Sequence, residues 1–126
     1  MVKKTIFPEH SAGLGLPLSP AVAYKDLIFL SGQTGYHGNR ELAVGDFDAQ
    51  MHQVMKNIIS VLEAAHSSLD KVLKMNIYIS KPEFFPKMNE IYKSYFSHQN
   101  FPARTTLVVD FAAPELLVEI ECVAIK

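Results

Sequence analysis

Apolar residues recur at steps of three and four positions between residues 47 and 65, which is the spacing of one face of a helix. Asp46 stands directly before this stretch, and aspartate is a residue type that favours the start of a helix. The pattern predicts one long amphipathic helix capped near Asp46. Its apolar stripe consists of Phe47, Met51, Val54, Ile58, Val61, Leu62 and Ala65.

A second, shorter helical pattern occupies residues 81–98 and contains Pro82 and Pro86. Proline is tolerated in the first turn of a helix but breaks its interior, so this helix must start close to both prolines. The apolar positions of the pattern are Phe84 or Phe85, Met88, Ile91, Tyr92 and Tyr95.

The other stretches alternate between apolar and polar residues, as strands do. Residues 21–33 predict two short strands joined by a turn at Lys25 and Asp26. Residues 101–109, FPARTTLVV, predict a buried strand in which Arg104 is the unexpected residue. Further strands are predicted at residues 5–7, 71–80 and 116–125.

The predicted order of elements is β-β-β-α-β-α-β-β, within a single domain spanning residues 1–126. Two helices can cover only one face of the sheet. The apolar side chains that we expect to face the helices are Leu73, Met75, Ile77 and Ile79 in one strand, and Leu116, Val118, Ile120, Cys122 and Ala124 in the last strand.

The uncovered face is expected to carry Arg104 and Thr106 from one strand and Glu119 and Glu121 from the next. One interpretation is a solvated face, on which Arg104 pairs with a glutamate across strands for about 0.2–1 kcal/mol. The other is a subunit interface, because apolar residues share this face and a charged pair there is shielded from water. These apolar residues are Val108, Leu117, Val123 and Ile125.

Composition removes several classes of function. The chain carries 12 basic and 13 acidic residues, for a net charge of −1, so there is no broad basic surface for nucleic acid or an anionic membrane. Its one cysteine, Cys122, cannot form an internal disulfide, and the start of the chain does not develop a signal-peptide pattern; we therefore expect a cytoplasmic protein. The histidines lack the paired spacing of metal ligands, so no metal site is predicted.

Five segments carry a resemblance that covers nearly the whole chain. They are PLSPAV at 17–22, LSGQTG at 30–35, MNEIYKSYF at 88–96, FPARTT at 101–106 and VEIECVAI at 118–125. In order and spacing the sequence resembles the RidA (YjgF/YER/UK-type) family of reactive-intermediate deaminases.

The resemblance implies a chorismate-mutase-like α+β fold, with a mixed, mainly antiparallel six-stranded sheet and two helices on one face. It also implies a homotrimer with a pocket between each pair of neighbouring subunits. The implied reaction is hydrolysis of 2-imino acids to 2-keto acids and ammonia, which removes reactive intermediates released by pyridoxal-phosphate enzymes.

That reaction suits two of the residues independently. The substrate has a carboxylate beside a C=N carbon, and the planar guanidinium of Arg104 can bind a carboxylate through two hydrogen bonds. A partly buried glutamate can accept and return protons, and Glu119 matches the acid of the family. Orientation and acid–base help suffice for a reactive imine, so we expect neither a metal nor a cofactor.

Three further positions match the family's substrate-binding residues. Gly32 would let a ligand approach the backbone closely, although a turn at a strand end explains it equally well. Thr106 would hold the carboxylate through its backbone amide. Asn89 would lie near the pocket, although a lone asparagine also braces local backbone.

One segment departs from the family. Where many members read GPYSQAV, this chain reads LPLSPAV, so Leu18 replaces a pocket tyrosine and Pro20 a glutamine. The change predicts weaker turnover of small imines or a preference for bulkier apolar ones. It also keeps open a trimer that binds small carboxylates without catalysis, whereas an RNA-directed inhibitor of translation or ribonuclease fits the charge balance poorly.

Overall fold

The computed structural model describes residues 2–8 and 15–126. Its elements confirm the predicted order β-β-β-α-β-α-β-β. They are β1 (Lys4–Ile6), β2 (Ala21–Tyr24), β3 (Leu27–Gln33), α1 (Phe47–Ala64), β4 (Val72–Ile79), α2 (Phe85–Ser94), β5 (Ala103–Val108) and β6 (Val118–Ile125), with short 3-10 turns at Leu69–Lys71, Pro82–Phe84 and Ser97–Gln99.

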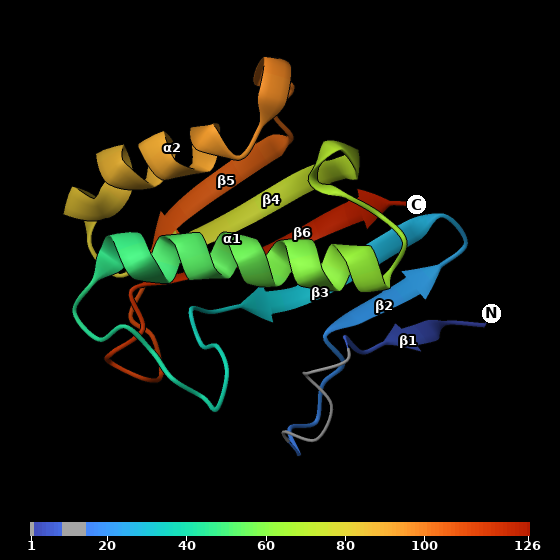
Figure 1. Cartoon of the computed structure of the whole chain (residues 1–126), viewed down its shortest axis with the longest axis horizontal. Coiled ribbons are helices and arrows are strands. Elements are labelled where there is room, and N and C mark those ends of the chain that lie inside the picture. Colours follow the sequence, from blue (N-terminus) through green and yellow to red (C-terminus); the bar gives the residue numbers. More distant parts are fainter. Residues whose placement is uncertain (1, 9–14) are drawn as a thin grey trace.

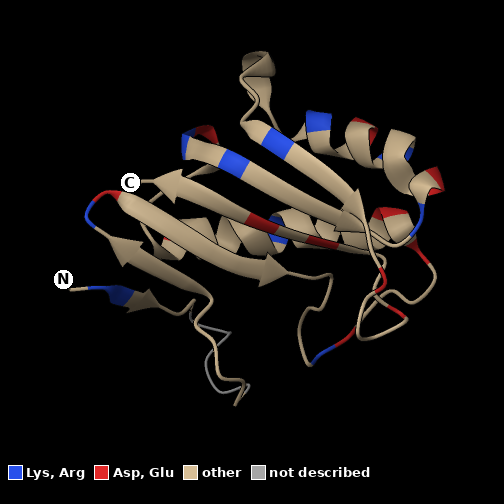
Figure 2. Ribbon diagram, turned by 180° about the vertical axis from the view of Figure 1, so that it is seen from behind, with Lys and Arg blue, Asp and Glu red and all other residues tan. Residues whose placement is uncertain are grey.

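The strands form one six-stranded sheet in the order β1-β2-β3-β6-β4-β5. Every neighbouring pair is antiparallel except β4 and β5, which run parallel. Both helices lie on the same face of this sheet (Figure 1), and the view from behind shows the opposite face without a helix (Figure 2). The predicted fold class is therefore confirmed.

Helix α1 starts as predicted, because the side chain of Asp46 accepts a hydrogen bond from the Ala49 amide at 3.0 Å. Its apolar stripe is buried against the sheet, as are Met88, Ile91 and Tyr92 of α2. Among residues 2–8 and 15–126, no helix is both long and apolar enough to cross a membrane.

The strand that carries Arg104 differs from the prediction of a buried strand. Strand β5 lies at the edge of the sheet, where it pairs only with β4. Leu107 is 50% exposed and Val108 is 53% exposed. The apolar run therefore belongs to an edge strand whose Leu107 and Val108 side chains are exposed in the single chain. Such a strand can pack on another molecule.

The predicted placement of Arg104 beside Glu119 and Glu121 is wrong. Residues paired on neighbouring strands point to the same face, and Arg104 pairs with Met75, which is fully buried under the helices. Glu119 pairs with Tyr78, which alternates with the buried positions of β4 and so faces the helix-free side. Because β4 lies between β5 and β6, no cross-strand pair between Arg104 and a glutamate can form.

Three other face assignments are also wrong. Leu73 sits in a β-bulge, where one extra residue of β4 shifts the register against β6, so Val72 is buried in its place and Leu73 is exposed. Val108 pairs with Ile79 and thus belongs to the helix-covered face. Leu117 lies just before β6 and packs partly against the core.

Candidate active site

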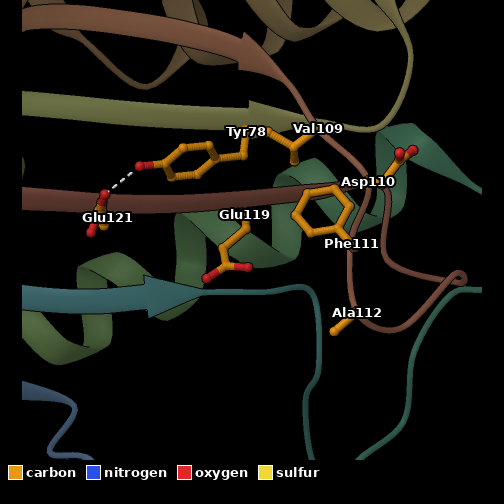
Figure 3. Close-up of a pocket in the computed structure, with 7 residues that line it drawn as sticks. All are labelled: Tyr78, Val109, Asp110, Phe111, Ala112, Glu119 and Glu121. Atoms are coloured by element: carbon orange, nitrogen blue, oxygen red, sulfur yellow. Dashed lines mark hydrogen bonds between the residues drawn. The ribbon is translucent and has the colours of Figure 1, made fainter.

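Glu119 lies in a cavity of about 380 Å³ on the helix-free face, beside the loop that joins β5 to β6 (Figure 3). Strand β6 positions this side chain, because its alternate residues Val118 and Ile120 are buried in the core and so direct Glu119 to the opposite side. The cavity is lined by Tyr78, Val109, Asp110, Phe111, Ala112, Glu119 and Glu121.

Gly32 is in direct contact with the Glu119 side chain. A β-bulge after Leu30 gives β3 one extra residue against β6 and brings Gly32 over the carboxylate. A Cβ atom at Gly32 would collide with Glu119 Oε1 and lie 2.9 Å from its Cδ. A side chain at position 32 would therefore displace the Glu119 carboxylate from its present position. The strand continues through Gln33 instead of turning at Gly32.

The Glu119 carboxyl holds its proton more tightly than an exposed glutamate does. Partial burial raises its pKa, and the nearby negative charge of Glu121 raises the pKa further. Within residues 2–8 and 15–126, no hydrogen bond or ion pair engages Glu119. Its carboxyl group is thus available to exchange a proton with a bound molecule.

Tyr78 and Glu121 form a second feature of this cavity, which the sequence did not indicate. The Tyr78 hydroxyl donates to Glu121 Oε1 at 2.5 Å, and Asn76 Nδ2 donates to the same oxygen at 3.4 Å. This hydrogen bond, together with burial, raises the pKa of Tyr78. The alternation of polar residues along β4 indicated that Tyr78 points away from the core. It could not show that Tyr78 lies beside Glu121 of β6.

Arg104 lies on the other face of the sheet, packed on α2. Its guanidinium lies 5.1 Å from the Tyr92 ring centroid and 5.9 Å from that of Phe85, and Nη1 lies 3.9 Å from Met88 Sδ. No acidic partner pairs with it in the described part of the chain. A guanidinium that contacts two aromatic rings and has no acidic partner among the described residues can bind a carboxylate with little loss of side-chain freedom.

Asn89 lies near Arg104, and its role in substrate binding stays a prediction. The two side chains line one cavity of about 310 Å³ at the edge of the sheet. Thr106 follows Arg104 on the same face, and its hydroxyl is buried without a hydrogen-bond partner among the described residues. The complete lining of this cavity is Asn89, Tyr92, Lys93, Phe101, Pro102 and Arg104.

Leu18 lines neither cavity and is 54% exposed. The segment that contains it still reaches the region of Gly32, because the Pro20 carbonyl accepts a hydrogen bond from the Ser31 amide at 2.9 Å. Its predicted role in a pocket stays a prediction, since a pocket between subunits would include a second chain.

The chain therefore carries two separate groups of candidate site residues. Gly32 and Glu119 meet on the helix-free face, and Asn89, Arg104 and Thr106 lie on the helix-covered face at the β5 edge. No group of three or more His, Cys, Asp or Glu side chains in residues 2–8 and 15–126 is arranged to hold a metal ion.

Comparison with known proteins decides the family. The family described as Endoribonuclease L-PSP matches residues 13–126. The chain belongs to this family, the RidA family. A RutC family protein of Pyrococcus horikoshii is 36% identical over 99% of both chains. The human 2-iminobutanoate/2-iminopropanoate deaminase is 32% identical over 100% of this chain and 92% of its own.

A solved structure of RidA from an Antarctic bacterium, Psychrobacter sp., has the same fold, with a TM-score of 0.89 at 31% identity over 98% of this chain and 99% of its own. The Escherichia coli protein TdcF with bound serine superposes with a TM-score of 0.87 at 25% identity, covering 98% of each chain. Together with the sheet order, this similarity confirms the RidA fold for this chain.

Proposed function

We propose that the protein hydrolyses 2-imino acids to 2-keto acids and ammonia, at sites where Arg104 of one subunit meets Glu119 of a neighbour in a homotrimer. The observation that carries the proposal is the Glu119 cavity. It holds a half-buried carboxyl group with a raised pKa. Among the described residues this carboxyl group has no hydrogen-bond or ion-pair partner, and Gly32 beside it has no side chain. The named activity of the human relative supports the same reaction.

The chemistry follows from these two residues. Arg104 binds the substrate carboxylate through paired N–H donors and so fixes the imine carbon. Ionised Glu119 accepts a proton from water as the water oxygen bonds to that carbon and the C=N double bond becomes a single bond. Glu119 then gives this proton to the nitrogen, which forms a neutral tetrahedral adduct with one hydroxyl and one amino group. As the C–N bond breaks, the hydroxyl proton passes through Glu119 to the same nitrogen, so that ammonia leaves while the C=O bond forms. General acid–base help of this kind contributes roughly 10²–10⁴-fold.

The placement of the two residues supports a site shared by two subunits. Within one chain the sheet separates Arg104 from Glu119, so one molecule cannot present both to one small substrate. The helix-free face also leaves Leu27 39%, Phe29 47% and Leu107 50% exposed. Apolar side chains of this size on one face favour contact with another subunit.

A binding protein without catalysis is the second candidate. The Escherichia coli relative holds serine, which is an amino acid with a carboxylate and no C=N bond. The loss of the tyrosine at position 18 also fits a site that binds without turnover. RNA is less favoured at the Glu119 cavity, since its charged lining residues are Asp110, Glu119 and Glu121, all acidic.

The test is release of keto acid and ammonia from freshly generated 2-iminobutyrate and 2-iminopropionate, with and without the protein. We expect acceleration by the wild type, and near-complete loss in folded Arg104→Lys, which keeps the charge but not the paired donors. Glu119→Gln should lose activity, whereas Glu121→Gln should keep most of it. Keto-acid binding without any acceleration would select the binding protein, and a monomer mass by light scattering would remove the shared site.

A further inference from the structure

Gln50 is a buried polar residue on the apolar side of α1. Its side chain is fully buried, and it lies one turn after Phe47, on the stripe that packs against the sheet. A buried side-chain amide needs partners for both its N–H groups and its oxygen. Gln50 obtains all of them from the backbone of two loops.

The first loop follows β3 and the second joins β5 to β6. Gln50 Nε2 donates to the Ala43 carbonyl at 3.0 Å and to the Glu115 carbonyl at 3.1 Å, and its Oε1 accepts from the Leu117 amide at 3.0 Å. Figure 1 shows these two loops side by side at the start of α1. One amide thus ties both loops to the helix.

The loop held by Gln50 forms much of the Glu119 cavity. Four of its residues, Val109, Asp110, Phe111 and Ala112, line the cavity, and Phe111 stands beside Glu119 in Figure 3. The amide that Gln50 binds belongs to Leu117, only two residues before Glu119. The loop also connects the strand of Arg104 to the strand of Glu119.

We infer that Gln50 is a positioning residue for Glu119, which fixes the start of β6 and the loop wall of the cavity from behind the sheet. The inference rests on the proposed function for its catalytic consequence. It does not depend on that function for its structural consequence. Loss of the Gln50 amide should loosen residues 109–117 and leave Glu119 poorly oriented, while carboxylate recognition by Arg104 is retained.

Asn57 on the same helix provides a matched control. Its Nδ2 donates to the carbonyls of Thr34 and Tyr36 at 2.9 and 2.8 Å, so it also ties α1 to loop backbone. Residues 34–36 do not line the Glu119 cavity. Gln50→Met and Asn57→Leu each replace an amide by an apolar side chain of similar size and remove two hydrogen bonds to carbonyls.

Hydrogen exchange measured by mass spectrometry is the first readout. Gln50→Met should raise exchange in residues 109–117, with the Leu117 amide among those exposed, and Asn57→Leu should not. The second readout is imine hydrolysis, for which Gln50→Met should lower kcat by about tenfold or more with little change in KM. Asn57→Leu should leave both constants unchanged.

Unchanged exchange in a folded Gln50→Met protein would overturn the inference whether or not the wild type is active. Raised exchange with wild-type kcat would show that the loop does not position Glu119. If the wild type fails to hydrolyse imines, the proposed function fails while the exchange result still decides the role of Gln50. Should Gln50→Met not fold, Gln50→Asn, which keeps the amide but is one methylene shorter, replaces it in both measurements.

Discussion

At the scale of single residues, the candidate site depends on close approach between Gly32 and Glu119. Since a Cβ at position 32 would meet the carboxylate and not backbone, the glutamate can rotate away and the fold can survive the substitution. We therefore expect Gly32→Ala to keep a melting temperature near that of the wild type but to lower kcat by about tenfold or more. Thermal unfolding and imine turnover on one sample measure both. Wild-type turnover in this variant would mean that the carboxylate need not occupy its present position.

The charge of Glu121 leads to a pH prediction. Burial is the larger cause of the raised pKa of Glu119, and the charge of Glu121 raises this pKa further. In the proposed reaction Glu119 must be ionised to act as a base. Glu121→Gln removes this negative charge, so the pKa of Glu119 falls and the rise of kcat/KM with pH should move to lower pH. Tyr78→Phe leaves the Glu121 charge in place and is the control; it should not move the rise downward. An unmoved profile in Glu121→Gln would assign the rise to another group.

At the scale of elements, Tyr92 couples α2 to the sheet edge. It is 3% exposed, its ring packs 4.8 Å from that of Phe96, and burial raises its pKa to about 12. Because the folded pKa exceeds the unfolded value of about 10, this contribution to stability is complete below pH 10 and is lost as pH rises through 12.

Tyr92→Phe should therefore protect against alkaline unfolding. The Tyr92 hydroxyl is buried without a partner among the described residues, so its removal should leave stability at pH 7 equal or slightly higher. Urea unfolding at pH 7 and pH 11 measures the effect, and the advantage of the variant should be larger at pH 11. Cys122, whose pKa is also raised to about 12, is common to both proteins and cancels in the comparison. Equal advantages at the two pH values would contradict the assignment.

The elements themselves could be predicted from the sequence, but their pairing could not. Periodicity gave both helices, and alternation correctly placed Arg104 with Thr106 and Glu119 with Glu121. Alternation within a strand says nothing about the face of another strand, which depends on strand order and register. The sequence-based prediction placed the strand of Arg104 next to β6, but β5 pairs in parallel with β4, which separates it from β6. The predicted face of Arg104 was therefore reversed.

Gln50 shows a second limit of the same kind. Its position one turn after Phe47 put it on the apolar stripe, and this was a readable signal of burial. Its partners lie in two loops, one of them up to 67 residues away, and no local pattern specifies the paths of these loops. A sequence can thus indicate that a polar residue is buried without indicating its hydrogen-bond partners.

At the scale of the whole molecule, the sheet divides the proposed site between two polypeptides. Arg104→Lys and Glu119→Gln should each be inactive alone, yet they damage opposite faces. When the two proteins are unfolded together and refolded as mixed trimers, about a quarter of the sites should combine an intact Arg104 with an intact Glu119. Recovery of activity to about that fraction is the expected result. The double variant mixed with either one is the control and should recover nothing.

The same division has a genetic meaning. Two defective alleles, one altered at Arg104 and one at Glu119, would restore function to each other in a single cell, although neither would do so alone. Conversely, subunits altered at both positions would inactivate every site that they share with a normal subunit. In the proposed trimer the unit of heritable function is a pair of neighbouring chains, because the two sides of one sheet would serve two different sites.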